Sequence, residues 1–194
     1  MATQSPLADT ITDFWQMIFD FNCELIVMMH QEYPQDPTYA NYCPAAGSIK
    51  FGPFTITVDE VSLPCKTIVR RDLILQKRNE SRQIRQIQFL GWPEDASVPD
   101  VQYLFEFVKL VTREHVTSPI VVHCMDSATR TGLFCAAFEL ITETPSNEQI
   151  DIYHCIQKLR MTRPQFIPNL EQYKFLHDLM IFYLQGFDTY ANLS

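Results

Sequence analysis

The sequence predicts an α/β fold, in which strands form a sheet and helices flank it. Runs of β-branched residues with partial alternation indicate successive strands between residues 54 and 90. Before and after these runs, apolar residues recur three and four positions apart, which indicates amphipathic helices. A short apolar run at 119–123 leads through a loop into another helical pattern, as is typical of a buried strand followed by a helix.

Length and composition favour one globular domain. The chain has 194 residues, of which 46% are hydrophobic and 12% are aromatic, and no linker or repeat divides it. We therefore expect a single domain over residues 1–194. The formal net charge of −8 argues against a nucleic-acid partner, which would need a basic face. No apolar run approaches the roughly eighteen residues that a membrane span requires.

The cysteine pattern favours reduced thiols over disulfides or a zinc site. None of the cysteines forms a C-x-x-C pair, and most lie inside apolar runs. The first residues, Met1-Ala2-Thr3-Gln4, lack the charged and apolar regions of a signal peptide. We therefore expect a cytoplasmic chain that binds no metal and needs no cofactor. The cysteines are residues 23, 43, 65, 124, 135 and 155.

The N-terminal half predicts one helix and several strands. Asp9 or Thr10 can cap a helix whose apolar residues recur over 11–19. Residues 24–29 then have the pattern of a buried strand, and the proline-containing segment 31–47 that of a loop. Further strands are expected at 54–58, 67–75 and 82–90, with a turn at 77–80.

The C-terminal half predicts four helices. Asp100 can cap the first, after a loop at 92–99 that prolines bracket, and the second starts at Thr131. The third and fourth begin with capping boxes, Ser146 with Gln149 and Asn169 with Gln172, and the third ends near Met161. The stripes expected to face inward are Leu104, Phe105, Val108 and Val111; Leu133, Phe134, Ala137 and Leu140; Ile152, Ile156 and Leu159; and Tyr173, Leu176, Leu179 and Met180.

The loop between the predicted strand at 119–123 and the helix after it carries the candidate site. Cys124 and Arg130 enclose five residues on a turn that feeds a helix N-terminus. Backbone N–H groups and the helix dipole attract an anion there, and a guanidinium matches two phosphate oxygens. The same field favours a thiolate, so Cys124 would be a nucleophile. The structural alternative is a cysteine that only packs and an arginine that is solvated.

The segment Val122-His123-Cys124, then five residues, then Arg130-Thr131-Gly132 resembles the signature loop of the protein tyrosine phosphatases. The resemblance extends over nearly all of the chain and implies the family's fold, a twisted mixed sheet flanked by helices. It also implies that the family's N-terminal segment is missing here. The other matching segments, in order, are Ala2-Thr3-Gln4-Ser5-Pro6, Asp13-Phe14-Trp15-Gln16-Met17, Val27-Met28-Met29, Gly91-Trp92-Pro93 and Glu171-Gln172-Tyr173.

The resemblance assigns roles to residues of the site. Cys124 would attack phosphorus, Arg130 would bind the phosphoryl oxygens, and the Thr131 hydroxyl would help the thiolate leave. Glu94 stands where active members have the aspartic acid that protonates the leaving group. The phosphate loop would be Met125, Asp126, Ser127, Ala128 and Thr129, supported by His123, Gln172 and, where the family keeps a glutamate that orients the arginine, Glu32.

The loop interior departs from the family at Asp126, Ser127 and Thr129, where active members have small residues, commonly glycine, that tolerate the positive φ of a phosphate-binding backbone. Thr129 at a positive φ would be strained by about 1–3 kcal/mol. Asp126 would either face a bound phosphate, with a repulsion of roughly 3 kcal/mol per unit charge, or point outward. Glu94 would misplace the acid by about an ångström and slow proton transfer. Pro168 replaces a glutamine that positions water in active members.

These departures resemble the second, membrane-distal domains of receptor-type tyrosine phosphatases, closest to the MAM-containing subfamily. We expect a catalytically impaired domain that acts as a regulatory or protein-binding module in the intracellular part of a receptor. Its partner would be a phosphotyrosine protein or a first phosphatase domain of the same receptor. The alternative is an active phosphatase that hydrolyses phosphotyrosine through a phosphocysteine. A third possibility is a redox-sensing thiol, in which Cys124 is oxidised with Cys135 nearby.

Overall fold

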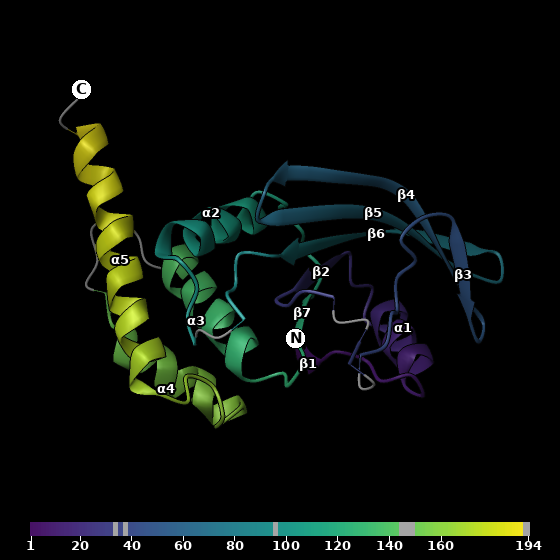
Figure 1. Cartoon of the computed structure of the whole chain (residues 1–194), viewed down its shortest axis with the longest axis horizontal. Helices are drawn as coiled ribbons and strands as arrows, with labels where there is room; N and C mark the ends of the chain where they lie inside the picture. The colour runs from purple at the N-terminus through teal and green to yellow at the C-terminus, as the bar shows by residue number, and fades with distance from the viewer. Residues whose placement is uncertain (33–34, 37–38, 95–96, 144–149, 192–194) are drawn as a thin grey trace. The chain divides into compact units, whose positions relative to one another are not determined.

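The chain is built from a sheet and a set of helices. The computed structural model describes residues 1–32, 35–36, 39–94, 97–143 and 150–191. Contacts divide it into a sheet unit, Met1–Leu90 with Val116–Ser127, and a helical unit, Gly91–His115 with Ala128–Ser194. The α/β class is confirmed, because one mixed sheet and several helices make up these units (Figure 1). The single domain over residues 1–194 stays a prediction.

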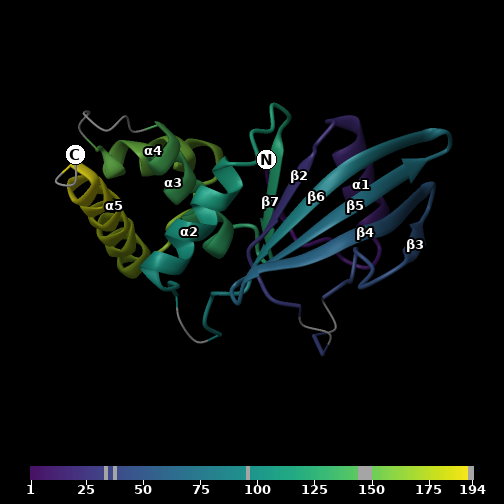
Figure 2. The ribbon, with the colours of Figure 1, turned by 90° about the horizontal axis from the view of Figure 1, so that it is seen from above.

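The described strands form one sheet in the order β1-β7-β2-β6-β5-β4-β3 (Figure 2). Pairing is parallel from β1 through β7 and β2 to β6, and antiparallel from β6 through β5 and β4 to β3. The predicted mixed sheet is therefore confirmed. The strands are β1 Ala2–Gln4, β2 Leu25–Met28, β3 Ser48–Phe51, β4 Phe54–Cys65, β5 Ile68–Lys77, β6 Glu80–Phe89 and β7 Ile120–Cys124.

Two short strands, β1 and β3, were not predicted as strands. Each has three or four residues, which is too short to show an alternation of period two. β4 continues to Cys65, well past the predicted end at residue 58. Its C-terminal part alternates poorly because it is exposed on both faces, so only pairing with β5 reveals it.

Helix α1, Ile11–Asp20, packs on one face of the sheet (Figures 1 and 2). Its buried side chains join sheet residues in one apolar cluster, and Trp15 Nε1 donates to the Tyr42 carbonyl at 3.1 Å. Thr10 is the N-cap residue, as one of the two predicted alternatives, but its side chain does not bond to a helix N–H. Thr10 Oγ1 instead accepts from the Leu7 N–H at 2.9 Å, which holds the chain that enters the helix.

The helical unit contains α2 Val101–Thr112, α3 Thr129–Glu143, α4 Ile152–Thr162 and α5 Leu170–Ala191. The predicted cap of α2 is confirmed, because the Asp100 side chain accepts from the Tyr103 N–H at 3.1 Å. Phe107, which was not predicted to be inward, packs against Phe134 with ring centroids 5.6 Å apart. The predicted inward residues are buried except Phe105, Leu159 and Tyr173, which are half-buried at the edges of their stripes.

The predicted start of α4 is wrong. Ser146 and Gln149 lie outside the described residues, but Ile150 and Asp151 are not helical and the helix starts at Ile152. Asp151 is the N-cap residue, and its carboxylate accepts from the His154 N–H at 2.9 Å. That backbone hydrogen bond lowers the pKa of Asp151. A capping residue directly before the first buried position, Ile152, thus prevails over the earlier Ser-x-x-Gln pattern.

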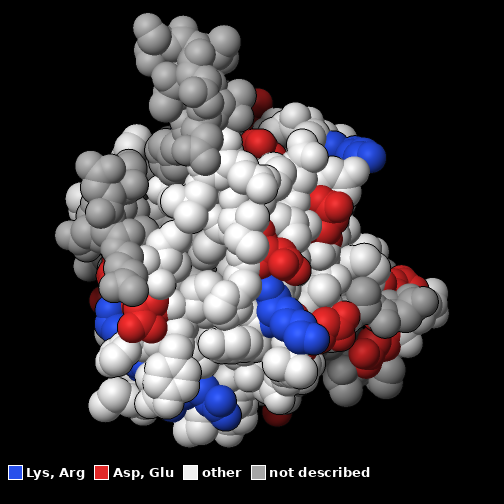
Figure 3. Space-filling model, turned by 90° about the vertical axis from the view of Figure 1, so that its left-hand side faces the viewer, with Lys and Arg blue, Asp and Glu red and all other residues white. Residues whose placement is uncertain are grey.

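Charge on the helical unit matches the acidic composition. Lysines and arginines are interspersed with carboxylates on the face shown in Figure 3, without a continuous basic patch. Among the described residues, no helix combines the length and apolarity needed to cross a bilayer.

Candidate functional site

Neighbouring strands fix the start of the signature loop. β7 lies between β1 and β2, and His123 is in register with Thr3 on one side and Met28 on the other. Beyond the ladder, the His123 carbonyl accepts from the Met29 N–H at 2.8 Å, and the Cys124 carbonyl accepts from the Ser5 N–H at 2.7 Å. The chain therefore leaves the sheet at Cys124 in a fixed direction, and Cys124 is buried.

His123 belongs to a buried polar network in the sheet unit. Its Nε2 lies 2.7 Å from the Tyr42 hydroxyl, which also accepts from Gln86 Nε2 at 2.5 Å. Burial, followed by the nearby His30, lowers the pKa of His123 well below its ordinary value, so the ring is neutral at pH 7. The histidine before Cys124 therefore supplies a fixed neutral dipole. Tyr42 and Gln86 are site residues that the sequence did not reveal, because each lies far from the motif along the chain.

Asp126 faces Cys124 rather than solvent alone. The Cys124 thiol donates to Asp126 Oδ1 across 3.0 Å. Asp126 is otherwise exposed, so its carboxylate lies beside the sulfur and also reaches solvent. A thiol can donate to a carboxylate and a thiolate cannot, and two negative charges repel each other. A carboxylate at this distance from the sulfur repels a thiolate, which is the nucleophilic form of a cysteine.

The predicted strain at Thr129 is wrong. Thr129 is the first residue of α3, which begins two residues before the predicted Thr131, and its backbone is helical. The positive φ falls on Ser127, at 62°. Because α3 starts at Thr129, only four residues separate it from Cys124 at the end of β7. The left-handed backbone conformation that turns the chain therefore falls on Ser127. A serine there costs about 1–2 kcal/mol relative to a glycine.

Arg130 and Trp92 stack within the helical unit. The guanidinium carbon lies 5.4 Å from the centroid of the Trp92 ring, which is a cation–π distance. Trp92 is buried and Arg130 is half-buried, so part of the Arg130 side chain is accessible to solvent. The glycine of the motif, Gly132, packs against the Phe166 ring. A Cβ at position 132 would lie 2.9 Å from that ring, so a larger residue would clash. Thr131 is fully buried in the first turn of α3.

Gln172 and Ser97 connect three segments of the helical unit. The Asn169 side chain accepts from the Gln172 N–H at 2.9 Å, so the predicted N-cap of α5 is confirmed. The Gln172 side chain does not return to Asn169. Its Nε2 donates instead to the Ser97 carbonyl at 3.1 Å and to the Thr129 carbonyl at 3.4 Å. Glu94, in the turn that follows Trp92, is exposed.

Glu32 is paired within the sheet unit. Its Oε1 accepts from Arg71 Nη2 at 2.8 Å, while Arg71 Nη1 donates to Gln86 and Gln88, each also at 2.8 Å. Arg71 was not singled out from the sequence, because a charged residue in a strand is ordinarily solvated. Of the remaining predicted loop residues, Met125 and Ala128 are half-buried.

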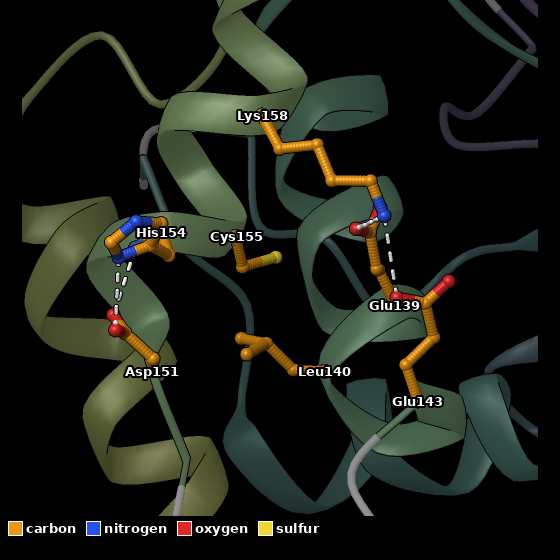
Figure 4. Close-up of a pocket in the computed structure, with 7 residues that line it drawn as sticks. All are labelled: Glu139, Leu140, Glu143, Asp151, His154, Cys155 and Lys158. Atoms are coloured by element: carbon orange, nitrogen blue, oxygen red, sulfur yellow. Dashed lines mark hydrogen bonds and ion pairs between the residues drawn. The ribbon is translucent and has the colours of Figure 1, made fainter.

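A separate pocket of about 250 Å³ lies between α3 and α4 and contains none of the predicted site residues. Lys158 bridges Glu139 at 2.7 Å and Glu143 at 3.3 Å across it (Figure 4). Burial, with Glu139 beside it, raises the pKa of the Cys155 thiol to about 12, so this thiol is inert. Within the described ranges, no cluster of His, Cys, Asp and Glu is suited to a metal ion, and none of the six cysteines forms a disulfide.

Comparison with known proteins identifies the family. The protein-tyrosine phosphatase family model matches residues 1–182. The chain belongs to this family. As a protein-tyrosine phosphatase domain, it is 33% identical over 200 residues to human receptor-type tyrosine-protein phosphatase alpha, covering 100% of this chain and 25% of that protein.

Two further relatives align over most or all of the chain. Mouse receptor-type tyrosine-protein phosphatase epsilon is 33% identical over 205 residues, which cover 100% of this chain and 29% of that protein. Rat phosphatidylinositol phosphatase PTPRQ is 33% identical over 196 residues, which cover 93% of this chain and 8% of that protein. The phosphatase domain thus spans about a quarter of the length of the first relatives that it matches.

Proposed function

We propose that this tyrosine-phosphatase domain hydrolyses phosphotyrosine poorly and acts as a regulatory or protein-binding module in phosphotyrosine signalling. The observation that carries the proposal is the 3.0 Å hydrogen bond from Cys124 Sγ to Asp126 Oδ1. Attack on phosphorus needs the thiolate, and at this distance a carboxylate opposes the thiolate by roughly 1–5 kcal/mol, depending on the local dielectric. The same carboxylate opposes a bound phosphate dianion.

Other departures act in the same direction. Glu94 carries its carboxyl one methylene farther from the backbone than the family's aspartate, which weakens a proton transfer that depends on position. Pro168 offers no side-chain donor or acceptor to a hydrolytic water. A phosphocysteine, once formed, would therefore break down slowly.

The Arg130 side supports binding. A guanidinium stacked on the buried Trp92 has less freedom to lose when it engages two phosphate oxygens. We propose that the partner is a phosphotyrosine protein or the first phosphatase domain of the same receptor. In this proposal the chain is a second, membrane-distal domain of a receptor phosphatase of the MAM-containing subfamily, in the cytoplasm. The names of the receptor-type relatives support the receptor assignment.

The alternative is a working tyrosine phosphatase. Cys124, Arg130 and Thr131 are retained, and Glu94 is still acidic, so each chemical role of the family has a residue. This reading requires the carboxylate of Asp126 to leave the sulfur when substrate binds.

Hydrolysis of p-nitrophenyl phosphate, a phosphotyrosine peptide and a phosphatidylinositol phosphate by the purified chain separates the two functions. The lipid is included because one relative is named for that substrate. Cys124→Ser provides the blank. We expect turnover close to the blank together with calorimetric binding of the phosphotyrosine peptide. Turnover more than about a hundredfold above the blank would establish the active enzyme instead.

A further inference from the structure

Ser97 fastens the segment that carries Glu94 to two helices of the helical unit. Its hydroxyl donates to the Glu171 carboxylate, and its carbonyl accepts from Gln172 Nε2 at 3.1 Å. The same nitrogen lies 3.4 Å from the Thr129 carbonyl, in the first turn of α3. These contacts of Ser97, Glu171, Gln172 and Thr129 are called the Ser97 clamp.

The geometry of Gln172 shows what the clamp favours. The side chain is fully buried, and two carbonyl oxygens fix the orientation of its amide, because a flipped amide would place oxygen against oxygen. Its Oε1 is buried and has no hydrogen-bond partner within the described part of the chain. An unpaired buried acceptor lowers stability. We therefore assign Gln172 the role of holding the Ser97 and Thr129 carbonyls in place, rather than that of stabilising α5.

The clamp lies at one end of the Glu94 segment, and the stacking of Trp92 on Arg130 lies at the other. Both ends are thus attached to the start of α3, directly or through Gln172. We propose that Glu171 and Gln172 are positioning residues that set the place of the proton-donor segment relative to Arg130. The inference rests on the proposed phosphatase function, in which Glu94 is the acid. Neither residue is assigned a contact with substrate.

Hydrogen exchange of the amides in residues 91–99 measures the clamp without reference to catalysis. Gln172→Met preserves the size of the side chain, removes the donor and also removes the unpaired oxygen. Gln172→Glu preserves the size and removes the two N–H donors. We expect exchange in this segment to become about tenfold faster in both variants, while the Tm of Gln172→Met does not fall. A residue needed only for the fold would lower Tm instead.

Matched variants complete the test. Glu171→Gln keeps an acceptor for the Ser97 hydroxyl and should leave exchange within about twofold of the original chain, whereas Glu171→Ala should accelerate it. Lys174→Ala, on the exposed face of α5, is the control. Unchanged exchange at 91–99 in both Gln172 variants would overturn the clamp.

Tungstate, a phosphate mimic, separates this inference from the proposed function. Calorimetric titration of the original chain should show tungstate binding, because the Arg130 guanidinium can pair with two oxyanion oxygens. Absence of tungstate binding to the original chain would contradict phosphate recognition while leaving the exchange result valid.

Discussion

The two ends of the signature loop have opposite surroundings. At the strand end, the Cys124 thiol lies 3.0 Å from a carboxylate, and a neutral buried histidine precedes it. At the helix end, the Arg130 guanidinium stacks on an aromatic ring 5.4 Å away. The first environment opposes negative charge, and the second leaves a cation available for it. In the proposed function, phosphate binding and phosphate chemistry are therefore separable in one loop, and mutations at the two ends should have different consequences.

The largest effect is expected at the helix end. Arg130→Met removes a bidentate, charge-assisted partner, and we expect tungstate affinity to fall by about a hundredfold. The tungstate affinity of Arg130→Lys should lie between those of the original chain and Arg130→Met, because lysine keeps the positive charge but cannot donate two parallel hydrogen bonds. Calorimetry at constant salt measures both, with Lys174→Ala as the control. If Arg130→Met bound tungstate normally, the binding half of the comparison would be wrong.

The next effect tests the strand end. Asp126→Ala removes the carboxylate from the Cys124 thiol, and alkylation of Cys124 by iodoacetamide at pH 7 should become about tenfold faster. Asp126→Asn separates charge from contact and should accelerate the reaction too. Mass spectrometry of the Cys124 peptide measures the rate, and Asp178→Asn is the control. An unchanged rate would remove the electrostatic explanation for weak catalysis.

Two other thiols supply an internal reference for this experiment. Burial raises the pKa of Cys43 to about 11 and that of Cys155 to about 12. Both should therefore react slowly between pH 7 and 9 in every variant. Fast alkylation of these residues would indicate that the chain had unfolded rather than that Cys124 had been activated.

A smaller effect concerns pH and the network beneath Cys124. The pKa of His123 is lowered in the folded chain, so below the unfolded value of about 6.5 the unfolded chain takes up a proton that the folded chain does not. Stability should therefore be full above that pH and fall by about 1.4 kcal/mol per pH unit below it, down to the folded pKa. Urea denaturation from pH 7 to 5 measures this slope. His123→Gln should reduce the slope, and His177→Gln, at an exposed position, should not.

The smallest effect concerns the helical unit alone. Asp151→Ala removes the cap of α4 and should lower the free energy of unfolding by about 1 kcal/mol. Ser146→Ala should have no effect, because α4 begins after Asp151. Equal losses in the free energy of unfolding in the two variants would contradict a helix start at Ile152. Neither variant should alter Cys124 alkylation or tungstate binding, so this pair also tests whether the site tolerates changes elsewhere.

Local signals in the sequence were enough for much of the fold. Asp100 and Asn169 were predicted as caps and accept the expected backbone hydrogen bonds, because capping depends on residues three positions apart. The start of α4 was mispredicted because two capping signals compete within a few residues. The apolar pattern predicts Phe105 but not Phe107 inside, whereas Phe107 is buried and Phe105 is half-buried. An apolar stripe defines the inward face of a helix only to within about one residue.

The sequence by itself determined the fold class, the family's signature residues and the departures at Glu94, Asp126 and Pro168. Tertiary structure decided which groups surround the signature loop. The direction of Asp126, the positive φ at Ser127 and the Tyr42 hydroxyl beside His123 depend on backbone paths that no short window encodes. The Gln172 contacts join carbonyls 43 and 75 residues away along the chain. Hydrogen bonds between distant segments form only when packing brings their donors and acceptors within about 3 Å, so they cannot be inferred from local pattern.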